Sequence, residues 1–255
     1  MRASGRTDGV RLDSPARIYR VARGVELDIG TSVGTMELRH HHAGWEVLLV
    51  HRGVAVVGGD GWRHVLVPGE AVVFHAGKLH GARPVHGRYV RTAFHFLPES
   101  VGPELNRLLM RHCSDKPALL AFHDSRVLLG IEQKPPDRIA NFLVDELQER
   151  LLRREPGATP YPATLPSPLG GVLRYLVEGV GHKETIRDVA KRFFVSEGHL
   201  RRMFLQYLGC PLQRFWLYVK VEHACDLLLR DMSADEVSEA TGFQSRSGFI
   251  RAFRR

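Results

Sequence analysis

The sequence predicts an α+β protein, in which an N-terminal antiparallel β-barrel with flanking helices precedes an all-α domain where a long helix joins two helix-turn-helix units. Three observations predict this fold. Residues 20–97 consist of short apolar runs separated by glycine-rich turns, as in antiparallel β domains. Residues 156–169 are rich in proline. After them, apolar residues recur at three- and four-residue steps, in a pattern that occurs twice.

Composition bounds the class of protein. The 255 residues suffice for two domains that each bury a core. The net charge of +8 favours a polyanionic partner. Because the chain has neither an apolar membrane span nor an N-terminal signal core, we expect it to be soluble and cytoplasmic, without a membrane partner. The cysteines Cys113, Cys210 and Cys225 have no paired spacing, which predicts reduced thiols.

The β domain is expected to contain strands such as 46–50 and a glycine-rich turn over 58–61. Helical spacing over 103–112 and 138–152 predicts two helices that close the domain. The apolar stripe over 143–151 indicates either an ordinary buried face or a surface that pairs with its twin in a homodimer.

A proline-rich stretch marks the domain boundary, because neither helix interiors nor central strands tolerate such a composition. Its prolines are Pro156, Pro160, Pro162, Pro166 and Pro168. We therefore expect a first domain over 1–155, a linker over 156–169 and a helical domain over 170–255.

The helical domain opens with two short helices joined by a tight turn near Val195. Thr185 can cap the first helix through its hydroxyl, and Gly209 is the usual residue for ending the second in a left-handed turn. Apolar residues mark one face of each helix. They are Ile186, Val189, Ala190 and Phe193 in the first helix, and Leu200, Met203, Phe204 and Tyr207 in the second.

A second copy of this pattern follows, with Val195 mapping onto Phe243. Its apolar positions are Val237 and Ala240 before Gly242, then Phe249 and Phe253. Between the copies, helical spacing from Pro211 to Arg230 predicts one long helix. At about 1.5 Å per residue it forms a rod of roughly 30 Å, close to the ~34 Å between successive major-groove faces of B-DNA. One chain could therefore contact two adjacent groove segments.

These residues resemble the DNA-binding module of AraC/XylS-type transcription regulators over about residues 170–255. The matching segments are Ile186-Arg187-Asp188-Val189-Ala190, Val195-Ser196, Leu200-Arg201-Arg202-Met203-Phe204, Gly209-Cys210-Pro211, Ala224, Leu227-Leu228 and Gly242-Phe243. The closing segment 249–255 looks like the second recognition helix of that family. Four positions depart from the pattern. Lys220 replaces the usual arginine, Ala234 an isoleucine, Ser238 an alanine and Gly248 an aromatic residue. The end at Arg255 suggests a chain truncated before a last short helix, whose second unit is weaker.

The resemblance implies a set of base-facing residues in each unit. They are Gly198, His199, Arg201 and Arg202 in the first unit, and Arg246, Ser247, Ile250 and Arg251 in the second. Arg202 and Arg251 occupy matching places, and arginine can donate two hydrogen bonds to guanine. The alternative is that these arginines remain solvated or touch phosphates without reading sequence.

The β domain carries a histidine-rich motif, G-x5-H-x-H-x3-E-x6-G, that starts at Gly34. Its His40, His42 and Glu46 have even separations, which predicts that they share one strand face. His80 follows a second glycine-rich stretch that could bring it beside them. Three imidazoles and one carboxylate suit a divalent transition metal such as Zn, Mn, Fe or Ni.

This pattern resembles the cupin barrel, a fold that often precedes the AraC-type DNA-binding module. His75 and Pro84 depart from the second cupin motif, where a proline and an asparagine are usual. Sensor cupins often keep only fragments of the ligand pattern, so the alternative is a polar pocket whose histidines hydrogen-bond an effector or one another. Trp45, Trp62 and Phe74 could line a pocket for a small-molecule effector, although large aromatic residues of a small barrel commonly form its core.

The combined features predict a sequence-specific transcription regulator of the AraC type, either an activator or a repressor, that binds double-stranded promoter DNA under control of an effector or metal. RNA polymerase and a second copy of the chain are further expected partners. No catalytic residue is assigned, and an enzyme is not expected. The main rival is a metal-loaded cupin enzyme with dioxygenase or isomerase chemistry. A third interpretation is a DNA-binding scaffold that does not switch.

Overall fold

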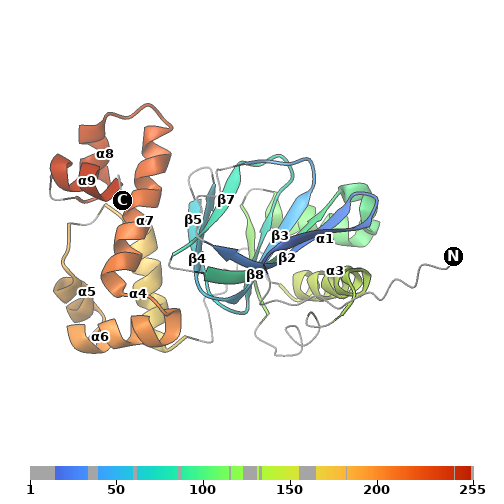
Figure 1. Ribbon diagram of the computed structural model, residues 1–255, viewed down its shortest axis with the longest axis horizontal. Coiled ribbons are helices and arrows are strands. Elements are labelled where there is room, and N and C mark those ends of the chain that lie inside the picture. The colour runs from blue at the N-terminus through green and yellow to red at the C-terminus, as the bar shows by residue number, and fades with distance from the viewer. Residues whose placement is uncertain are drawn as a thin grey trace. The chain divides into compact units, whose positions relative to one another are not determined.

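The computed structural model describes residues 15–33, 40–59, 62–85, 88–114, 116–122, 131, 134–154, 165–181, 183–243 and 245–253 (Figure 1). The motif residue Gly34, turn residues 60–61, the linker residues 155–164 and the last residues 254–255 lie outside this set. The chain forms two compact units, one with Met1–Gly61 and Leu66–Pro162, the other with Trp62–Val65 and Ala163–Arg255. No helix in the described ranges is long and apolar enough to cross a membrane.

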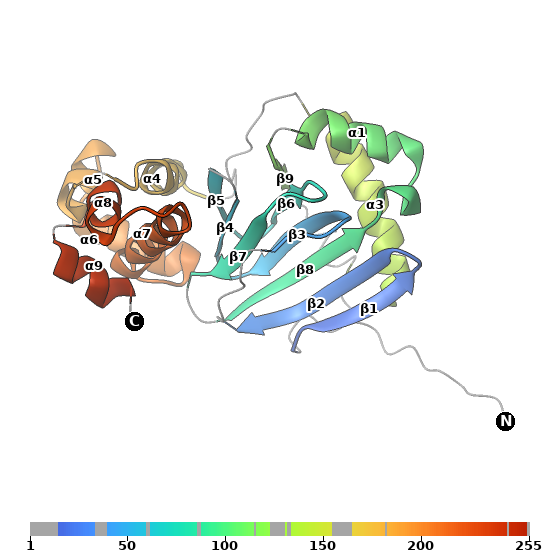
Figure 2. The same cartoon turned by 90° about the horizontal axis from the view of Figure 1, so that it is seen from above.

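The N-terminal region is built from two antiparallel sheets (Figure 2). The larger has the order β1-β2-β8-β3-β6-β9 and the smaller the order β5-β4-β7. The strands are β1 (Arg17–Ala22), β2 (Val25–Val33), β3 (Trp45–Arg52), β4 (Ala55–Gly59), β5 (Trp62–Leu66), β6 (Glu70–Phe74), β7 (His80–Pro84), β8 (Arg88–Phe96) and β9 (Ala118–Ala121). The antiparallel β domain is confirmed, whereas closure of its sheets into a barrel stays a prediction.

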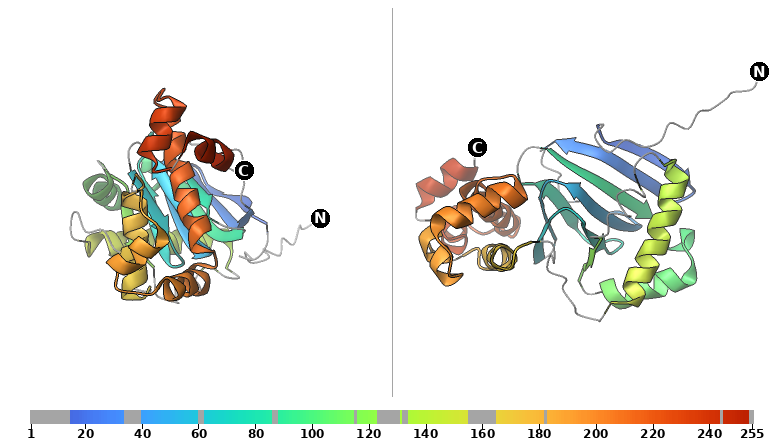
Figure 3. Two further views of the ribbon diagram at one scale, coloured as in Figure 1. Left: turned by 90° about the vertical axis from the view of Figure 1, so that its left-hand side faces the viewer. Right: turned by 90° about the horizontal axis from the view of Figure 1, so that it is seen from below.

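Two helices cover one face of the six-stranded sheet (Figure 3). They are α1 (Pro103–Cys113), which follows the short helix η1 (Pro98–Ser100), and α3 (Pro136–Leu152). Alternate strand residues such as Val47 and Phe94 share one core with α3. The apolar stripe of α3, from Ile139 to Leu151, is at most 1% exposed. The interpretation as a buried face is therefore confirmed, and this stripe does not form an exposed dimer surface.

The second unit is helical and begins earlier than expected. Helix α4 (Ser167–Glu178) includes the last three residues of the predicted linker, because Pro168 lies in its first turn, where a missing N–H costs nothing. The remaining helices are α5 (Ile186–Arg192), α6 (Glu197–Met203) with the π-helical turn η2 (Phe204–Leu208), α7 (Leu212–Leu228), α8 (Ala234–Ala240) and α9 (Arg246–Phe253). The long central helix is thus present as α7.

The repeat is visible in the helix caps. Thr185 and Asp188 form a capping box at the start of α5, and Ser233 and Glu236 form the same box at α8. The turns after the two helices are also equivalent, since Phe194 and Gly242 both have left-handed backbones, with φ of 55° and 65°. The first helix pair, α5 with α6, and the second helix pair, α8 with α9, therefore have the same capping box and the same left-handed turn. The helix-turn-helix arrangement itself stays a prediction.

Glu70 places a carboxyl group inside the β domain. The residue is 3% exposed, and its Oε2 accepts a hydrogen bond from the backbone N–H of Val67 at 3.1 Å. Burial raises the pKa of Glu70 to about 8, against the opposing effect of this hydrogen bond. The folded protein therefore keeps this carboxyl protonated at neutral pH.

Replacement of Glu70 should stabilise the protein in a pH-dependent way. Because the folded pKa of about 8 lies above the ordinary 4.5, the unfolded chain releases a proton that the folded state retains, and stability falls as pH rises between these values. Glu70→Gln should raise the free energy of unfolding by about 2 kcal/mol or more at pH 8 and change it little at pH 4. Urea unfolding at both pH values measures this. An equal gain at both, or the same behaviour in the exposed control Glu99→Gln, contradicts the assignment.

The backbone of Phe194 should destabilise the folded protein, because a left-handed conformation is unfavourable for a residue with a Cβ. Its side chain is 96% exposed, so burial does not offset this cost. Phe194→Gly should therefore raise the free energy of unfolding by about 0.5–1 kcal/mol. Leu229 is the matched control, since it is 70% exposed but has a helical backbone, with φ of −67°. Leu229→Gly should lower stability by a similar amount. Thermal unfolding compares the two, and a loss in both would show that the left-handed turn is unstrained.

Candidate functional sites

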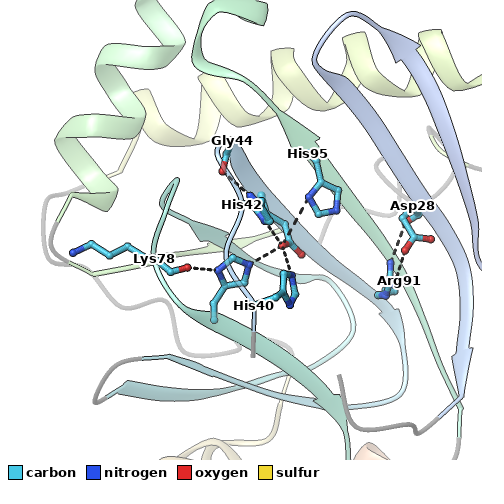
Figure 4. Close-up of polar contacts among 9 residues, drawn as sticks. Asp28, His40, His42, Gly44, Lys78, Arg91 and His95 are labelled. Atoms are coloured by element: carbon cyan, nitrogen blue, oxygen red, sulfur yellow. Dashed lines mark hydrogen bonds and ion pairs between the residues drawn. The ribbon is translucent and has the colours of Figure 1, made fainter. Parts of the chain in front are cut away.

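The carboxylate of Glu46 is the centre of a histidine cluster in the β domain, and Figure 4 labels His40, His42 and His95 of this cluster. Its Oε2 lies 2.9 Å from Nε2 of His42 and 2.9 Å from Nε2 of His80. Nε2 of His40 and Nδ1 of His95 follow at 3.8 and 3.9 Å. Glu46 itself is 5% exposed. Four imidazoles therefore surround one buried carboxylate.

The four predicted ligands come together, but not on one strand face. Strand β3 begins only at Trp45, so Glu46 alone belongs to it. His40 forms a backbone bridge to His80, with N–H···O distances of 2.9 and 3.0 Å. His42 lies in the turn before β3, where Gly44 approaches the backbone of Phe96 too closely for a Cβ. The expectation of a shared strand face is wrong, because the chain bends at residues 43–44 between His42 and the start of β3.

Each close imidazole is oriented by a backbone carbonyl. Nδ1 of His42 donates to the carbonyl of Gly44 at 2.8 Å, and Nδ1 of His80 donates to that of Lys78 at 2.7 Å. With Nδ1 protonated, a neutral imidazole presents a lone pair at Nε2. That lone pair faces the Glu46 carboxylate, which can only accept. A cation bound between these atoms would accept both Nε2 lone pairs and offset the charge of the carboxylate.

The charge of Glu46 is maintained by its neighbours. Burial by itself raises the pKa of Glu46, but hydrogen bonds from His40, His42 and His80 and the charge of His95 hold it well below its usual range. The carboxylate is therefore ionised and able to bind a cation.

The donor set fits a divalent transition metal. The ligand atoms of His40, His42, Glu46 and His80 all lie within 4.8 Å of one another. Three imidazole nitrogens and one carboxylate oxygen suit Zn, Mn, Fe or Ni. Carbonyl partners on the second ring nitrogens are the usual outer shell of metal-bound histidines.

His95 is the member that sequence reasoning missed. It lies on β8, directly opposite Glu46 of β3 in the sheet register. No motif includes it, so only the pairing of β3 with β8 could have revealed it. Farther along β8, Nη2 of Arg91 forms an ion pair of 2.6 Å with Oδ2 of Asp28, and Figure 4 shows this pair beyond His95. The polar face of the sheet thus continues past the histidines.

The three aromatic residues predicted for an effector pocket have different surroundings. Phe74 stacks on His80, with ring centroids 4.1 Å apart, and forms one wall of the cluster. Trp45 lies instead in the apolar core shared with α1 and α3, because it precedes Glu46 on the strand and so takes the opposite face. Its place in an effector pocket stays a prediction. Trp62 begins β5 and belongs to the other compact unit, so its role stays a prediction.

The residues predicted to face DNA lie on α6 and α9, and they differ in exposure and in their contacts within the protein. Arg202 and Arg251 are exposed and form no ion pair within the described residues. Arg201 is half-buried and pairs with Glu197, whereas Arg246 pairs with Asp235 at 3.3 Å. Gly198, His199 and Ser247 are exposed, and Ile250 packs against the core of the second helix pair.

The two regions match two models of known protein families. A model of the AraC-like ligand binding domain matches residues 36–140, and a model of the helix-turn-helix domain matches residues 189–255. Together these matches include the histidine cluster and both helix pairs.

Individual relatives match in part. The HTH-type transcriptional regulator RipA of Corynebacterium glutamicum is 31% identical over 136 residues, which are 53% of this chain and 38% of the relative. The lactose operon transcription activator of Staphylococcus xylosus is 29% identical over 70 residues, 27% of this chain and 25% of the relative. The matches thus span less than half the length of these relatives. Among solved structures, the C-terminal domain of AraT, a response regulator from Geobacillus stearothermophilus, has 26% identity and a TM-score of 0.35, over 36% of this chain and 78% of that chain.

Proposed function

For a chain that belongs to the AraC-type transcription regulators, with an AraC-like ligand-binding domain ahead of a helix-turn-helix domain, we infer sequence-specific binding to promoter DNA, controlled by a ligand of the β domain. The carrying observation is the equivalence of Arg202 on α6 and Arg251 on α9. Both side chains are exposed and lack an ion pair within the described residues, so their guanidinium groups can meet DNA without breaking an internal contact.

The spacing of the two helix pairs supports contact with two groove segments. Helix α7 has 17 residues and so spans about 26 Å. With the helices at its ends, this approaches the ~34 Å repeat of the major groove. Arg202 and Arg251 would then each reach one segment, where an arginine can donate to N7 and O6 of guanine.

The other predicted positions contribute less to base reading. Arg201 and Arg246 would have to leave Glu197 and Asp235, and Gly198 has no side chain. Packing of Ile250 in the core of the second pair limits its reach. Specificity is therefore expected to depend on Arg202, Arg251 and His199, with Ser247 and the remaining arginines contacting phosphates.

A metal at the histidine cluster is the proposed ligand of the β domain. His40, His42, Glu46 and His80 would hold it, with His95 beside them. A bound divalent cation would supply positive charge beside the carboxylate of Glu46 and accept the Nε2 lone pairs of His42 and His80. A small-molecule effector beside Phe74 is the alternative occupant.

Control of DNA binding requires that the ligand favour one of two arrangements of the protein. We expect the chain to act in the cytoplasm as an activator that meets RNA polymerase at the promoter, since a relative is named a transcription activator. A homodimer would place four arginine-bearing helix pairs on one promoter.

Loss of either recognition arginine should reduce sequence preference. Arg202→Ala and Arg251→Ala should each weaken binding to DNA from the protein's own promoter by about 5- to 150-fold, as a lost guanine contact does, with a smaller effect on random DNA. Mobility shifts across a salt series measure both affinities. The control Arg107→Ala removes the same charge from α1 and should change neither. Equal losses on both DNAs would reduce these arginines to phosphate contacts and refute base reading.

The metal proposal predicts one ion per chain. Calorimetric titration of metal-free protein with Zn²⁺, Mn²⁺ and Ni²⁺ should give saturable binding of at least one of them, weakened about 100-fold or more in His80→Ala and His42→Ala. The control His41→Ala alters an exposed neighbour and should bind as wild type. If both variants bind metal as tightly as wild type does, the cluster is a hydrogen-bonded pocket and not a metal site. Metal that binds without changing promoter affinity would support a scaffold that does not switch.

A further inference from the structure

The helical unit contains a cavity of about 420 Å³, and Arg251 is the one residue of its described lining that the proposed function uses. The start of α5, the middle of α7 and the first turns of α9 all contribute to its walls. The residues that matter are Lys183, Ile186, Trp216, Lys220, Phe243 and Arg251. Its volume falls in the range of ~300–1,000 Å³ typical of small-molecule sites.

The charges around this cavity are unbalanced. Lys183, Lys220 and Arg251 line it together with a single acid, Glu184. That carboxylate is already engaged, because Arg192 contacts it at 2.9 Å and the hydroxyl of Tyr175 donates to it. The cavity therefore carries positive charge that its own acidic residue does not neutralise.

Lys220 is the most constrained of these cations. Its half-buried ammonium donates to the carbonyl of Gly242 at 2.8 Å and lies 4.8 Å from the ring centroid of Trp216. Within the described residues it forms no ion pair with a carboxylate. Burial lowers the pKa of Lys220, as expected for a cation that has lost water without gaining a counterion. Its remaining N–H donors can serve an anion.

Trp216 contributes to the apolar wall. The residue is 8% exposed, and its ring lies next to the ammonium of Lys220. The apolar surfaces of Ile186, Leu217 and Phe243 complete the walls.

We propose that this cavity is a second ligand site of the protein, which binds a small organic anion with an aromatic body. Lys220 would hold the carboxylate, and Ile186, Leu217 and Phe243 would contact the ring. A phosphodiester of DNA has no apolar part to match these walls. Gly248 keeps the cavity open, at a position where the resemblance to AraC/XylS-type modules leads us to expect an aromatic side chain.

Such a ligand would act on DNA binding from within the helical unit. The cavity is bounded by Lys183 and Ile186 of the first helix pair and by Phe243 and Arg251 of the second. An occupant that contacts both pairs stabilises one relative placement of them. This regulation is independent of any ligand in the β domain.

The test is direct binding of 2-naphthoate to the full chain, without DNA, by isothermal titration calorimetry. Titrations with its neutral analogue 2-naphthamide and with inorganic phosphate separate the contribution of charge to the affinity from that of apolar contact. Wild type and the exposed-lysine control Lys191→Met should bind one naphthoate. Lys220→Met, which removes the charge, should bind about tenfold more weakly or worse, and so should wild type with naphthamide.

Gly248→Leu fills the cavity without touching a charge and should abolish binding. A Cβ there meets only the side-chain oxygen of Ser245, at 3.2 Å, so the fold can adjust, and thermal unfolding checks this. If Lys220→Met does not fold, naphthoate binding by Gly248→Leu decides whether the proposal holds. Naphthoate binding that is absent from wild type, matched by naphthamide, or unchanged in both variants overturns the proposal. If both variants instead weaken promoter and random DNA equally while naphthoate does not bind, the cavity holds a DNA phosphate.

Discussion

The six-stranded sheet must bury one face under α1 and α3, and the rest of the β domain depends on this constraint. Because side chains alternate along a strand, residues such as Val47, Leu49 and Phe94 enter the helix-covered core. Their neighbours Glu46 and His95 are then forced onto the other face. The histidine cluster is in this sense a consequence of the core, since a register shift of one residue would exchange the two sets.

The sequence predicted the elements better than the geometry of the site. Helical spacing located α3, α7 and both helix pairs, because apolar periodicity is a local property that packing preserves. The even spacing of His40, His42 and Glu46 predicts one strand, but Gly44 lies against the backbone of Phe96, which is distant in sequence. His95 could not be found for the same reason, since strand pairing, which no single segment encodes, places it beside Glu46.

The two helix pairs show how one local design accepts unequal residues. Both first helices begin with the same capping box, and both following turns require a left-handed backbone. Gly242 meets that requirement without strain, whereas Phe194 does not. The core of the second pair is small, with Ala224, Val237 and Phe249 as its fully buried members. The first pair therefore contains the strained backbone, whereas the second pair buries little apolar surface.

Each of the two units contains a charged group that is removed from water. Removing a charge from water is unfavourable unless partners within the protein replace the lost hydration. Glu46 has four imidazoles around it, so its charge is compensated in place. Lys220 lies beside one carbonyl and two aromatic rings, and no carboxylate pairs with it in the part of the chain that the structure describes. The same physical rule therefore underlies both proposals, a cation among the ring nitrogens that face Glu46 and an anion beside Lys220.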